Sequence, residues 1–329
     1  MTSVSAMGGT PSLLPAELLV SVLETISSTP GLAEGAEVTV ECNPETVTRD
    51  KLAAYRRAGV TRLSFGVQSM VPAVLASLGR DHAPEQVRRA VAFAGEEGFG
   101  YNVDLIFGAA GETMADWQRS LDEVLALEPP PGHVSAYALA VEAGTPLSRS
   151  PDRFPSPDDQ AEKYLRADEV LREHGFEWYE ISNWALPGRR CAHNLLYWAQ
   201  GEYAGLGCSA HSHRLVPGGG SRRWWNVRTP ERYCSLVEAA MPVEAAGEDL
   251  GPEVRELEAL ALSLRTDIGV PAEVVPDELF ELGLVELRPG ASSRLGALQA
   301  VLTPRGRLLA NEVAVRLVRL PAGGGVLRA

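Results

Sequence analysis

Residues 37–69 run EVTVECNPETVTRDKLAAYRRAGVTRLSFGVQS, and this stretch decides the fold. Two short apolar runs, Glu37–Cys42 and Arg62–Gln68, enclose a segment with helical periodicity at residues 48–58. Gly59 stands where that helix should end. Short, nearly continuous apolar runs that are rich in β-branched or aromatic residues are typical of strands buried on both faces. The stretch therefore predicts a strand–helix–strand unit.

The same alternation extends over residues 1–185. Further strands are predicted at Tyr101–Gly108, His133–Leu139 and Phe176–Ile181, and further helices at about 15–28, 84–97, 114–127 and 158–174. Regular alternation of this kind predicts an α/β fold with a parallel sheet, either open or closed into a barrel. We expect a barrel, because no strand carries the usual dinucleotide-binding loop.

Two further regions follow this barrel domain of residues 1–185. Residues 186–245 contain the HNLLYW and GLGCSAH segments and predict a linking region of loops and short strands around a site. Residues 246–329 predict a C-terminal winged-helix-like α+β domain. Its expected elements are helices at 254–264 and near 276–283, two short strands and a last helix at 307–318. The tail, residues 321–329, is expected to be mobile.

Composition and charge exclude several classes of protein. The 329 residues carry a net charge of −13, which argues against a nucleic-acid surface. No apolar run approaches the roughly 20 residues of a membrane span, and the first residues lack the pattern of a signal peptide. The expected compartment is the cytoplasm. The four widely spaced cysteines are expected to be thiols or metal ligands rather than disulfides.

Polar residues close successive strands of the predicted barrel. They are Gly8-Gly9-Thr10, Glu41, Gln68-Ser69 and Asp104, roughly one strand–helix unit apart. In β/α barrels the site forms at the carboxyl ends of the strands, so these residues predict a small-molecule site. Asp104 stands inside an apolar run, where a carboxyl group needs a hydrogen-bond partner.

Eight segments carry a resemblance to a known family. In their order, six of them resemble radical S-adenosylmethionine (radical SAM) enzymes of the coproporphyrinogen-dehydrogenase type: GGTPSLL, ECNPE, LSFGVQS, LGRDH, NVDLIFG and HVSAYAL. YEISNWALPGRRCAHNLLYW and YAGLGCSAHSH resemble one branch, the HemW-type heme chaperones. The resemblance covers nearly the whole chain from Gly8 and implies a partial (β/α) barrel of the radical SAM type.

The resemblance implies a role for individual residues in binding S-adenosylmethionine. The backbone of Gly8, Gly9 and Thr10 would hold its amino-acid end, since glycine backbone allows close approach. The residues implied to contact the rest of it are Glu41, Gln68, Arg80 and Asp104, with the small residue Ala140 beside it. A carboxylate can accept hydrogen bonds from ribose hydroxyls. For Arg80 an ordinary surface cation is the alternative.

The resemblance also implies a heme motif in the segment HNLLYW. Its residues are His193, Asn194, Tyr197 and Trp198. His193 is the implied iron ligand, because an imidazole can serve as an axial ligand of heme. The two aromatic rings offer flat apolar surface for the macrocycle, and Trp224-Trp225 either extend that surface or pack in the core.

Radical SAM chemistry uses a [4Fe-4S] cluster held by three cysteines in a C-x3-C-x2-C loop, which the family places upstream of the glycine loop. No two cysteines of this chain lie within four residues of each other, so the chain supplies no such ligand set. We expect a truncation at the N-terminus that removes the first β/α unit. A misassigned start codon or reading frame explains it better than a genuine loss.

Five potential metal ligands lie between residues 191 and 213, and they leave a zinc site open as an alternative to heme binding. They are Cys191, His193, Cys208, His211 and His213. Cys and His are the ligands that zinc prefers, but the spacings C-x-H and C-x2-H-x-H differ from those of common zinc fingers. Cys208 and His211 alternatively pack in a glycine-rich turn.

The expected function is a heme chaperone that delivers heme to hemoproteins such as respiratory enzymes. Its expected partners are heme and those recipients, without nucleic acid or a membrane span. A homodimer is left open, as is whether the chain is an enzyme. The alternative is an oxygen-independent coproporphyrinogen III oxidase of porphyrin biosynthesis, which needs cluster and S-adenosylmethionine together and is not expected to turn over in this chain. A third alternative is a zinc-stabilised interaction protein.

Overall fold

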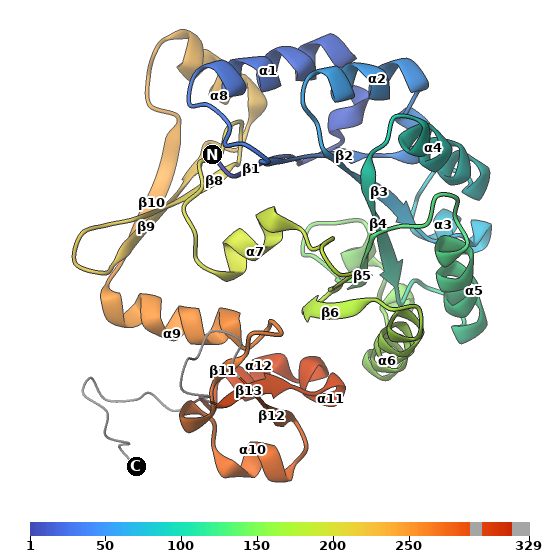
Figure 1. Cartoon of the computed structure of the whole chain (residues 1–329), viewed down its shortest axis with the longest axis vertical. Coiled ribbons are helices and arrows are strands. Elements are labelled where there is room, and N and C mark those ends of the chain that lie inside the picture. Colours follow the sequence, from blue (N-terminus) through green and yellow to red (C-terminus); the bar gives the residue numbers. More distant parts are fainter. Residues whose placement is uncertain (290–297, 318–329) are drawn as a thin grey trace. The chain divides into compact units, whose positions relative to one another are not determined.

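The computed structural model describes residues 1–289 and 298–317 (Figure 1). The chain divides into two compact units, Met1–His193 and Asn194–Ala329, and each is described by itself. The tail expected to be mobile, residues 321–329, lies outside the described residues. No helix in the described part of the chain has the length and apolar character needed to cross a membrane.

The first unit is built on a seven-stranded sheet with the strand order β1-β2-β3-β4-β5-β7-β6 (Figure 1). Strands β1 to β5 pair in parallel, as the alternation of strands and helices predicts. The strands are β1 (Ser3–Ala6), β2 (Glu37–Cys42), β3 (Arg62–Gln68), β4 (Gly100–Phe107), β5 (His133–Ala138), β6 (Glu177–Glu180) and β7 (Asn183–Ala185).

The far edge of the sheet differs from a purely parallel arrangement. β7 lies between β5 and β6 and is antiparallel to both. Only two residues separate β6 from β7, and such a short connection can join only antiparallel neighbours. The sheet is therefore mixed. With that change, the predicted α/β partial barrel is confirmed.

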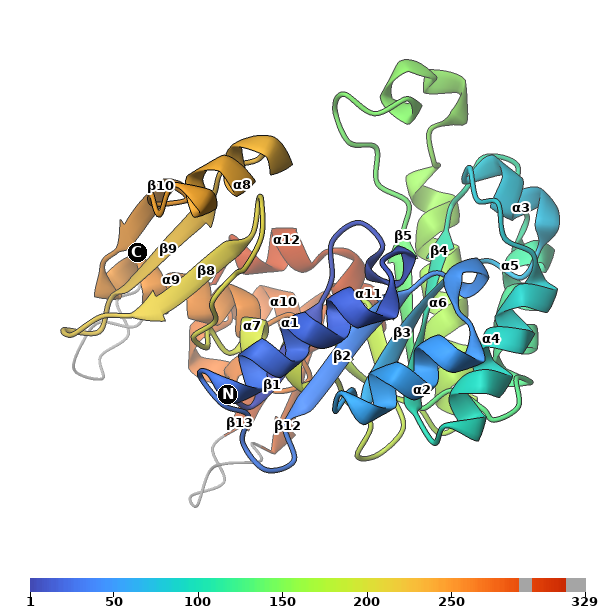
Figure 2. The same ribbon diagram turned by 90° about the horizontal axis from the view of Figure 1, so that it is seen from above.

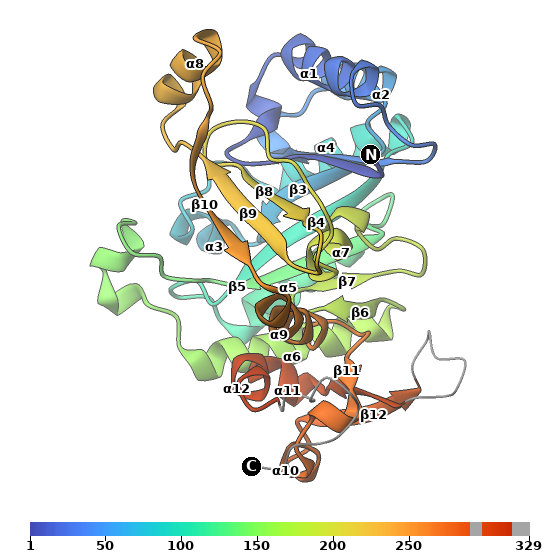
Figure 3. The same cartoon turned by 90° about the vertical axis from the view of Figure 1, so that its left-hand side faces the viewer.

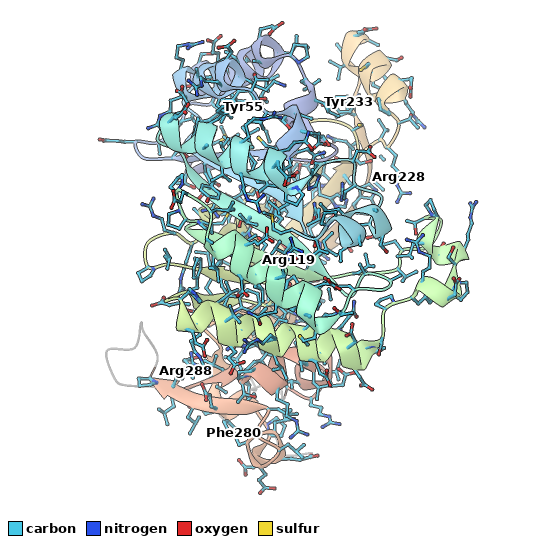
Figure 4. The ribbon with its side chains drawn as sticks, turned by 90° about the vertical axis from the view of Figure 1, so that its right-hand side faces the viewer. Tyr55, Arg119, Arg228, Tyr233, Phe280 and Arg288 are labelled. Atoms are coloured by element: carbon cyan, nitrogen blue, oxygen red, sulfur yellow. The ribbon has the colours of Figure 1, made fainter. Side chains whose placement is uncertain are left out.

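Helices cover the outer face of this sheet (Figures 1 and 2). Figure 4 shows α4, α5 and α6 side by side, with Arg119 on α5. Their bounds are α1 (Ala16–Ser28), α2 (Arg49–Arg57), α3 (Pro72–Ser77), α4 (Pro84–Glu96), α5 (Met114–Leu125) and α6 (Pro157–Glu173). The predicted helix ends are confirmed at α2, where Thr48 accepts a hydrogen bond from the Lys51 backbone and Gly59 has a φ of +88°.

The two faces of the strands differ in chemistry. Side chains on the outer face are fully buried hydrocarbons or aromatics, such as Leu63 on β3 and Val103 on β4. The alternate residues Ser64, Asn102 and Asp104 lie on the inner face, because successive side chains of a strand point to opposite sides. One face packs on the helices, and the other is polar.

A buried ion pair joins α6 to the loop between β4 and α5. The side chain of Lys163 is fully buried, and its Nζ lies 3.2 Å from Glu112 Oε2 and 2.7 Å from Asp159 Oδ2. Lys163 Nζ also donates to the backbone oxygen of Glu112 at 2.8 Å, and Gly108 N donates to Glu112 Oε2 at 2.6 Å. These contacts fix the loop that follows β4.

The second unit contains two small antiparallel sheets, β10-β9-β8 and β11-β13-β12 (Figure 3). Helix α7 (Ala192–Trp198) begins in the first unit and ends in the second. The remaining elements are β8 (His211–Leu215), β9 (Ser221–Asn226), α8 (Pro230–Glu238), β10 (Glu244–Leu250), α9 (Pro252–Ser263), β11 (Val270–Pro271), α10 (Asp277–Glu281), β12 (Val285–Pro289), β13 (Leu298–Leu302), α11 (Pro304–Leu308) and α12 (Ala310–Ala314).

The C-terminal elements follow the predicted winged-helix-like order of two helices, α9 and α10, and a strand pair, β12–β13. The last helix was predicted at residues 307–318, and residue 318 lies outside the described residues. The structure has two short helices there, α11 from Pro304 and α12 up to Ala314, because Leu309 at φ −115° and ψ 25° leaves helical geometry.

Candidate functional site

The glycine loop follows β1 directly and lies beside the end of β2. Gly8 and Gly9 have φ values of +88° and +69°, a region that residues with a side chain rarely adopt. Open space surrounds both glycines on the side where a Cβ would stand. The Gly8 amide donates to Glu41 Oε2 at 3.3 Å, and Thr10 Oγ1 accepts from Asn43 Nδ2 at 3.5 Å. The loop thus presents accessible backbone next to a carboxylate.

Glu41 and Asp104 form the acidic part of this site. Burial raises the pKa of Glu41; the hydrogen bond from the Gly8 amide lowers it, and the negative charge of Asp104 raises it. Burial also raises the pKa of Asp104, and hydrogen bonds from Ser64, Ser135 and Asn102 lower it. Two carboxyl groups near a glycine loop suit a ligand that carries hydrogen-bond donors or a positive charge.

The other three residues implied to contact S-adenosylmethionine differ in their burial. Gln68 ends β3 with a φ of +64° and is 9% exposed. Arg80 is exposed after α3, and Ala140 is exposed in the segment between β5 and α6, which projects from the sheet in Figure 2. In residues 1–289 and 298–317, no hydrogen bond or ion pair joins Arg80 or Ala140 to Gly8, Glu41 or Asp104.

The residues present do not fit an iron–sulfur cluster or a zinc ion. None of the four cysteines forms a disulfide, and burial raises the pKa of Cys42 to about 12, which keeps it protonated. Thiolates are the ligands of such clusters. Within the described ranges, no three His, Cys, Asp or Glu side chains group as a metal-ligand set.

Two residues of adjacent strands hold His193. Ser3 on β1 and Glu37 on β2 are directly paired in the parallel register. Ser3 Oγ lies 3.0 Å from His193 Nδ1. Glu37 accepts hydrogen bonds from the backbone amides of His193 and Ala192, each at 3.1 Å, and from Cys191 Sγ at 3.4 Å. One cross-strand pair thus fixes both the ring of His193 and the start of α7.

The environment of His193 keeps its imidazole neutral. The side chain is 9% exposed, and burial lowers its pKa, an effect that the nearby Glu37 carboxylate partly offsets. A neutral imidazole retains the nitrogen lone pair that a metal ion requires. His193 therefore has the protonation state of an iron ligand at neutral pH.

The remaining residues of the HNLLYW segment belong to the second unit. Tyr197 is exposed and packs edge-on against Tyr203, with ring centroids 4.7 Å apart, while Asn194 and Trp198 are half-buried. In the same unit His211 is exposed and stacks on Trp225 at 5.6 Å. His213 is buried, and its Nδ1 lies 2.8 Å from the Gly201 carbonyl oxygen. Further aromatic side chains, Tyr203 and Trp225, therefore come after the HNLLYW segment in the chain.

Ser3 and Glu37 are not among the site residues predicted from the sequence. Glu37 shares the polar face of β2 with Glu41, four residues later, and this alternation is the signal that could have identified it. Its partner, His193, lies 156 residues further along the chain. No spacing rule connects the two.

Glu180, at the end of β6, makes stability depend on pH. It is 2% exposed, and burial raises its pKa from 4.5 to about 7, although the Ser182 amide lowers it. The folded state therefore holds this proton more tightly than the unfolded state. Stability from this group is present below about pH 4.5 and falls as the pH rises toward about 7.

We expect Glu180→Gln to remove this fall. The wild-type protein should lose about 3 kcal/mol of unfolding free energy from this group between those pH values, and the variant should not. Urea unfolding across that pH range measures the difference. Glu17→Gln, at an exposed position on α1, is the control and should keep the wild-type profile. Identical profiles for Glu180→Gln and wild type would contradict the assignment.

Comparisons with known proteins concern the family and the fold of the chain. Residues 2–124 match the family model of the radical SAM superfamily. The heme chaperone HemW of Mycobacterium tuberculosis is 41% identical over 311 residues, which cover 93% of this chain and 78% of that protein. HemW of Bacillus subtilis is 32% identical over 320 residues, with 93% and 82% covered. Coproporphyrinogen III oxidase (HemN) from Escherichia coli, a radical SAM enzyme, superposes with a TM-score of 0.79 over 96% of this chain and 77% of its own; at 20% identity, this likeness shows the fold alone.

Proposed function

Because the chain belongs to the HemW family of heme chaperones within the radical SAM superfamily, we propose that it binds heme in the cytoplasm and delivers it to hemoproteins such as respiratory enzymes. Heme is the cargo in this proposal, and the recipient takes it from the chaperone. His193 supplies the iron ligand, while Tyr197 and Trp198 contact the macrocycle and Asn194 completes the motif.

The observation that carries this proposal is the way the chain holds His193. If Nδ1 donates its hydrogen to Ser3 Oγ, the lone pair of the neutral ring stands on Nε2. Protein groups that bond the second ring nitrogen of a ligating histidine commonly fix its tautomer and orientation. Ser3 has that role in the proposal, and Glu37 fixes the backbone from which the ring extends.

We further propose that S-adenosylmethionine binds at the strand ends of the first unit. The backbone of Gly8, Gly9 and Thr10 would hold the amino-acid end, and Glu41 and Asp104 would accept hydrogen bonds from its donors. Gln68 lines the same edge of the sheet, whereas Arg80 and Ala140 would have to come from the exposed segments in which they lie. These residues would bind and orient the ligand.

The oxidase alternative has less support. A coproporphyrinogen III oxidase of the radical SAM type needs the cluster and S-adenosylmethionine together, because those groups carry the difficult chemistry. The described residues hold no ligand set for that cluster. We therefore propose the chaperone function for the chain.

Hemin titration followed by transfer tests the proposed function. The purified chain should give a saturable Soret shift with hemin, and the loaded protein should pass heme to apomyoglobin, whose own spectrum reports the transfer. Hemin-loaded serum albumin provides the rate of passive release. A chain that gives no saturable shift, or that releases heme no faster to apomyoglobin than albumin does, would argue against a chaperone.

A further inference from the structure

A chain of buried polar groups crosses the inner face of the first unit from β6 to β3. Tyr179 lies on β6, and His133, Asn102 and Ser64 lie on the adjacent strands β5, β4 and β3; their hydrogen bonds lead to Asp104 on β4. Tyr179 is fully buried, and His133 and Asn102 are 1% and 5% exposed. The strand register brings them together, since Asn102 pairs with both Ser64 and His133.

The hydrogen bonds next to Asp104 have a defined direction. Asn102 Nδ2 donates to Asp104 Oδ1 at 2.8 Å and to Ser64 Oγ at 2.7 Å. Ser64 Oγ donates in turn to Asp104 Oδ2 at 2.7 Å. Both carboxylate oxygens thus accept a hydrogen bond, and the amide of Asn102 must direct its nitrogen toward them.

That orientation determines the state of His133. Asn102 Oδ1 can only accept, so His133 Nδ1, which contacts it, must carry the hydrogen. Burial and the positive charge of Arg62 lower the pKa of His133 well below its usual value, so its ring is neutral and Nε2 is an acceptor. The Tyr179 hydroxyl therefore donates to Nε2 across 2.7 Å. Every bond of the chain directs a hydrogen toward Asp104.

We infer that Asn102 and His133 are positioning residues that hold Asp104 as an ionised, oriented hydrogen-bond acceptor in the proposed S-adenosylmethionine site. The inference rests on that proposed site. Asp104 itself is half-exposed, so it has a side that a ligand hydroxyl can reach, while the network holds the other side. The charged groups that act on Asp104 are Glu41 on β2, whose charge opposes ionisation, and Arg62 on β3, whose charge favours it.

The direct test is the protonation state of Asp104 in the full chain. In protein labelled at the aspartate carboxyl carbon, the Asp104 signal, assigned by its loss in Asp104→Asn, gives the pKa by NMR titration. Asn102→Ala should raise that pKa by about one unit, because it removes a donor to the charged form. His133→Phe keeps a buried ring but lets the Asn102 amide turn, and it should raise the same pKa without touching Asp104.

Ser120→Ala is the matched control. Ser120 is fully buried on α5 and bonds Ser69 Oγ at 3.0 Å and the Met70 amide at 3.2 Å, outside the network. It should leave the pKa of Asp104 unchanged. The wild-type chain offers a second measurement that needs no variant. Nitrogen-15 NMR should show His133 protonated on Nδ1, and a ring protonated on Nε2 would overturn the inference.

Calorimetric titration with S-adenosylmethionine, and with S-adenosylhomocysteine as a second probe, connects the network to binding. Asn102→Ala and His133→Phe should each weaken binding by about tenfold at neutral pH, and Ser120→Ala should not. Variants that keep the wild-type pKa of Asp104 contradict the network. A wild-type chain that binds neither compound contradicts the proposed ligand site instead, so the two failures are distinguishable.

Discussion

His193→Ala is expected to weaken hemin binding by at least about tenfold and to abolish the Soret shift of an iron-bound imidazole. Ser3 and Glu37 hold this histidine by its ring and its backbone, and burial keeps the ring neutral. A preorganised, neutral ligand loses little entropy when it binds metal. Its removal should therefore affect affinity and spectrum together. Spectrophotometric titration with hemin measures both.

Three further variants distinguish a ligand from a general structural role. Glu37→Gln retains an oxygen acceptor for the α7 amides and should have an intermediate effect. His174→Ala changes an exposed histidine after α6 and should bind hemin as wild type does. His211→Ala tests the exposed, Trp225-stacked histidine of the second unit. Loss of the Soret shift in His211→Ala, with the shift retained in His193→Ala, would assign the iron ligand to the second unit.

Lys163→Ala is expected to destabilise the protein by about 3–5 kcal/mol, because it leaves the Glu112 carboxyl group buried without its cation. Burial already raises the pKa of Glu112, and the charge of Lys163 opposes that effect. The raised pKa should rise further in the variant. An acid with a raised folded pKa stabilises at low pH and loses that contribution as the pH rises. The destabilisation should therefore be larger at alkaline than at acidic pH in urea unfolding experiments.

A double variant and a surface variant complete this experiment. Lys163→Met with Glu112→Leu replaces the pair by apolar groups and should recover much of the lost stability. Arg119→Ala breaks an exposed pair with Glu123 on α5 and should change stability little. Equal stability of Lys163→Ala and Arg119→Ala would show that the buried pair contributes nothing beyond a surface one.

The sequence predicted the framework of the first unit because its signals are local. Apolar runs identified β2 to β6, and Gly59 identified the end of α2. Strand β7 was missed, and with it the antiparallel pairing to β5 and β6, because β7 has only three residues, too few for a periodic pattern. The glycine loop was predicted because the adjacent residues Gly8 and Gly9 form a local pattern that can be recognised in the sequence.

Part of the candidate site could be found in the same way, and part could not. Glu41 and Asp104 were predicted as acidic residues at strand ends. Glu41 is the last residue but one of β2 and bonds the glycine loop, whereas Asp104 lies in the middle of β4, so the prediction that it closes its strand is wrong. Arg80 and Ala140 were implied by the resemblance alone, and both lie in exposed segments. The network beside Asp104 was not predicted. Asn102 and His133 lie in apolar-looking runs, and only their strand register makes them neighbours.

The sequence by itself determined the family, the alternation of strands and helices, and the residue types at the strand ends. These follow from local composition and from the order of the motifs, and both can be read from the sequence alone. Only the tertiary structure decided that Ser3, Glu37 and His193 meet, and that one face of the sheet is polar. Parallel strands place residues side by side that are many positions apart in the chain. The same folding buries His193 and Glu180 and partly buries Asp104, and burial rather than residue type changes their protonation.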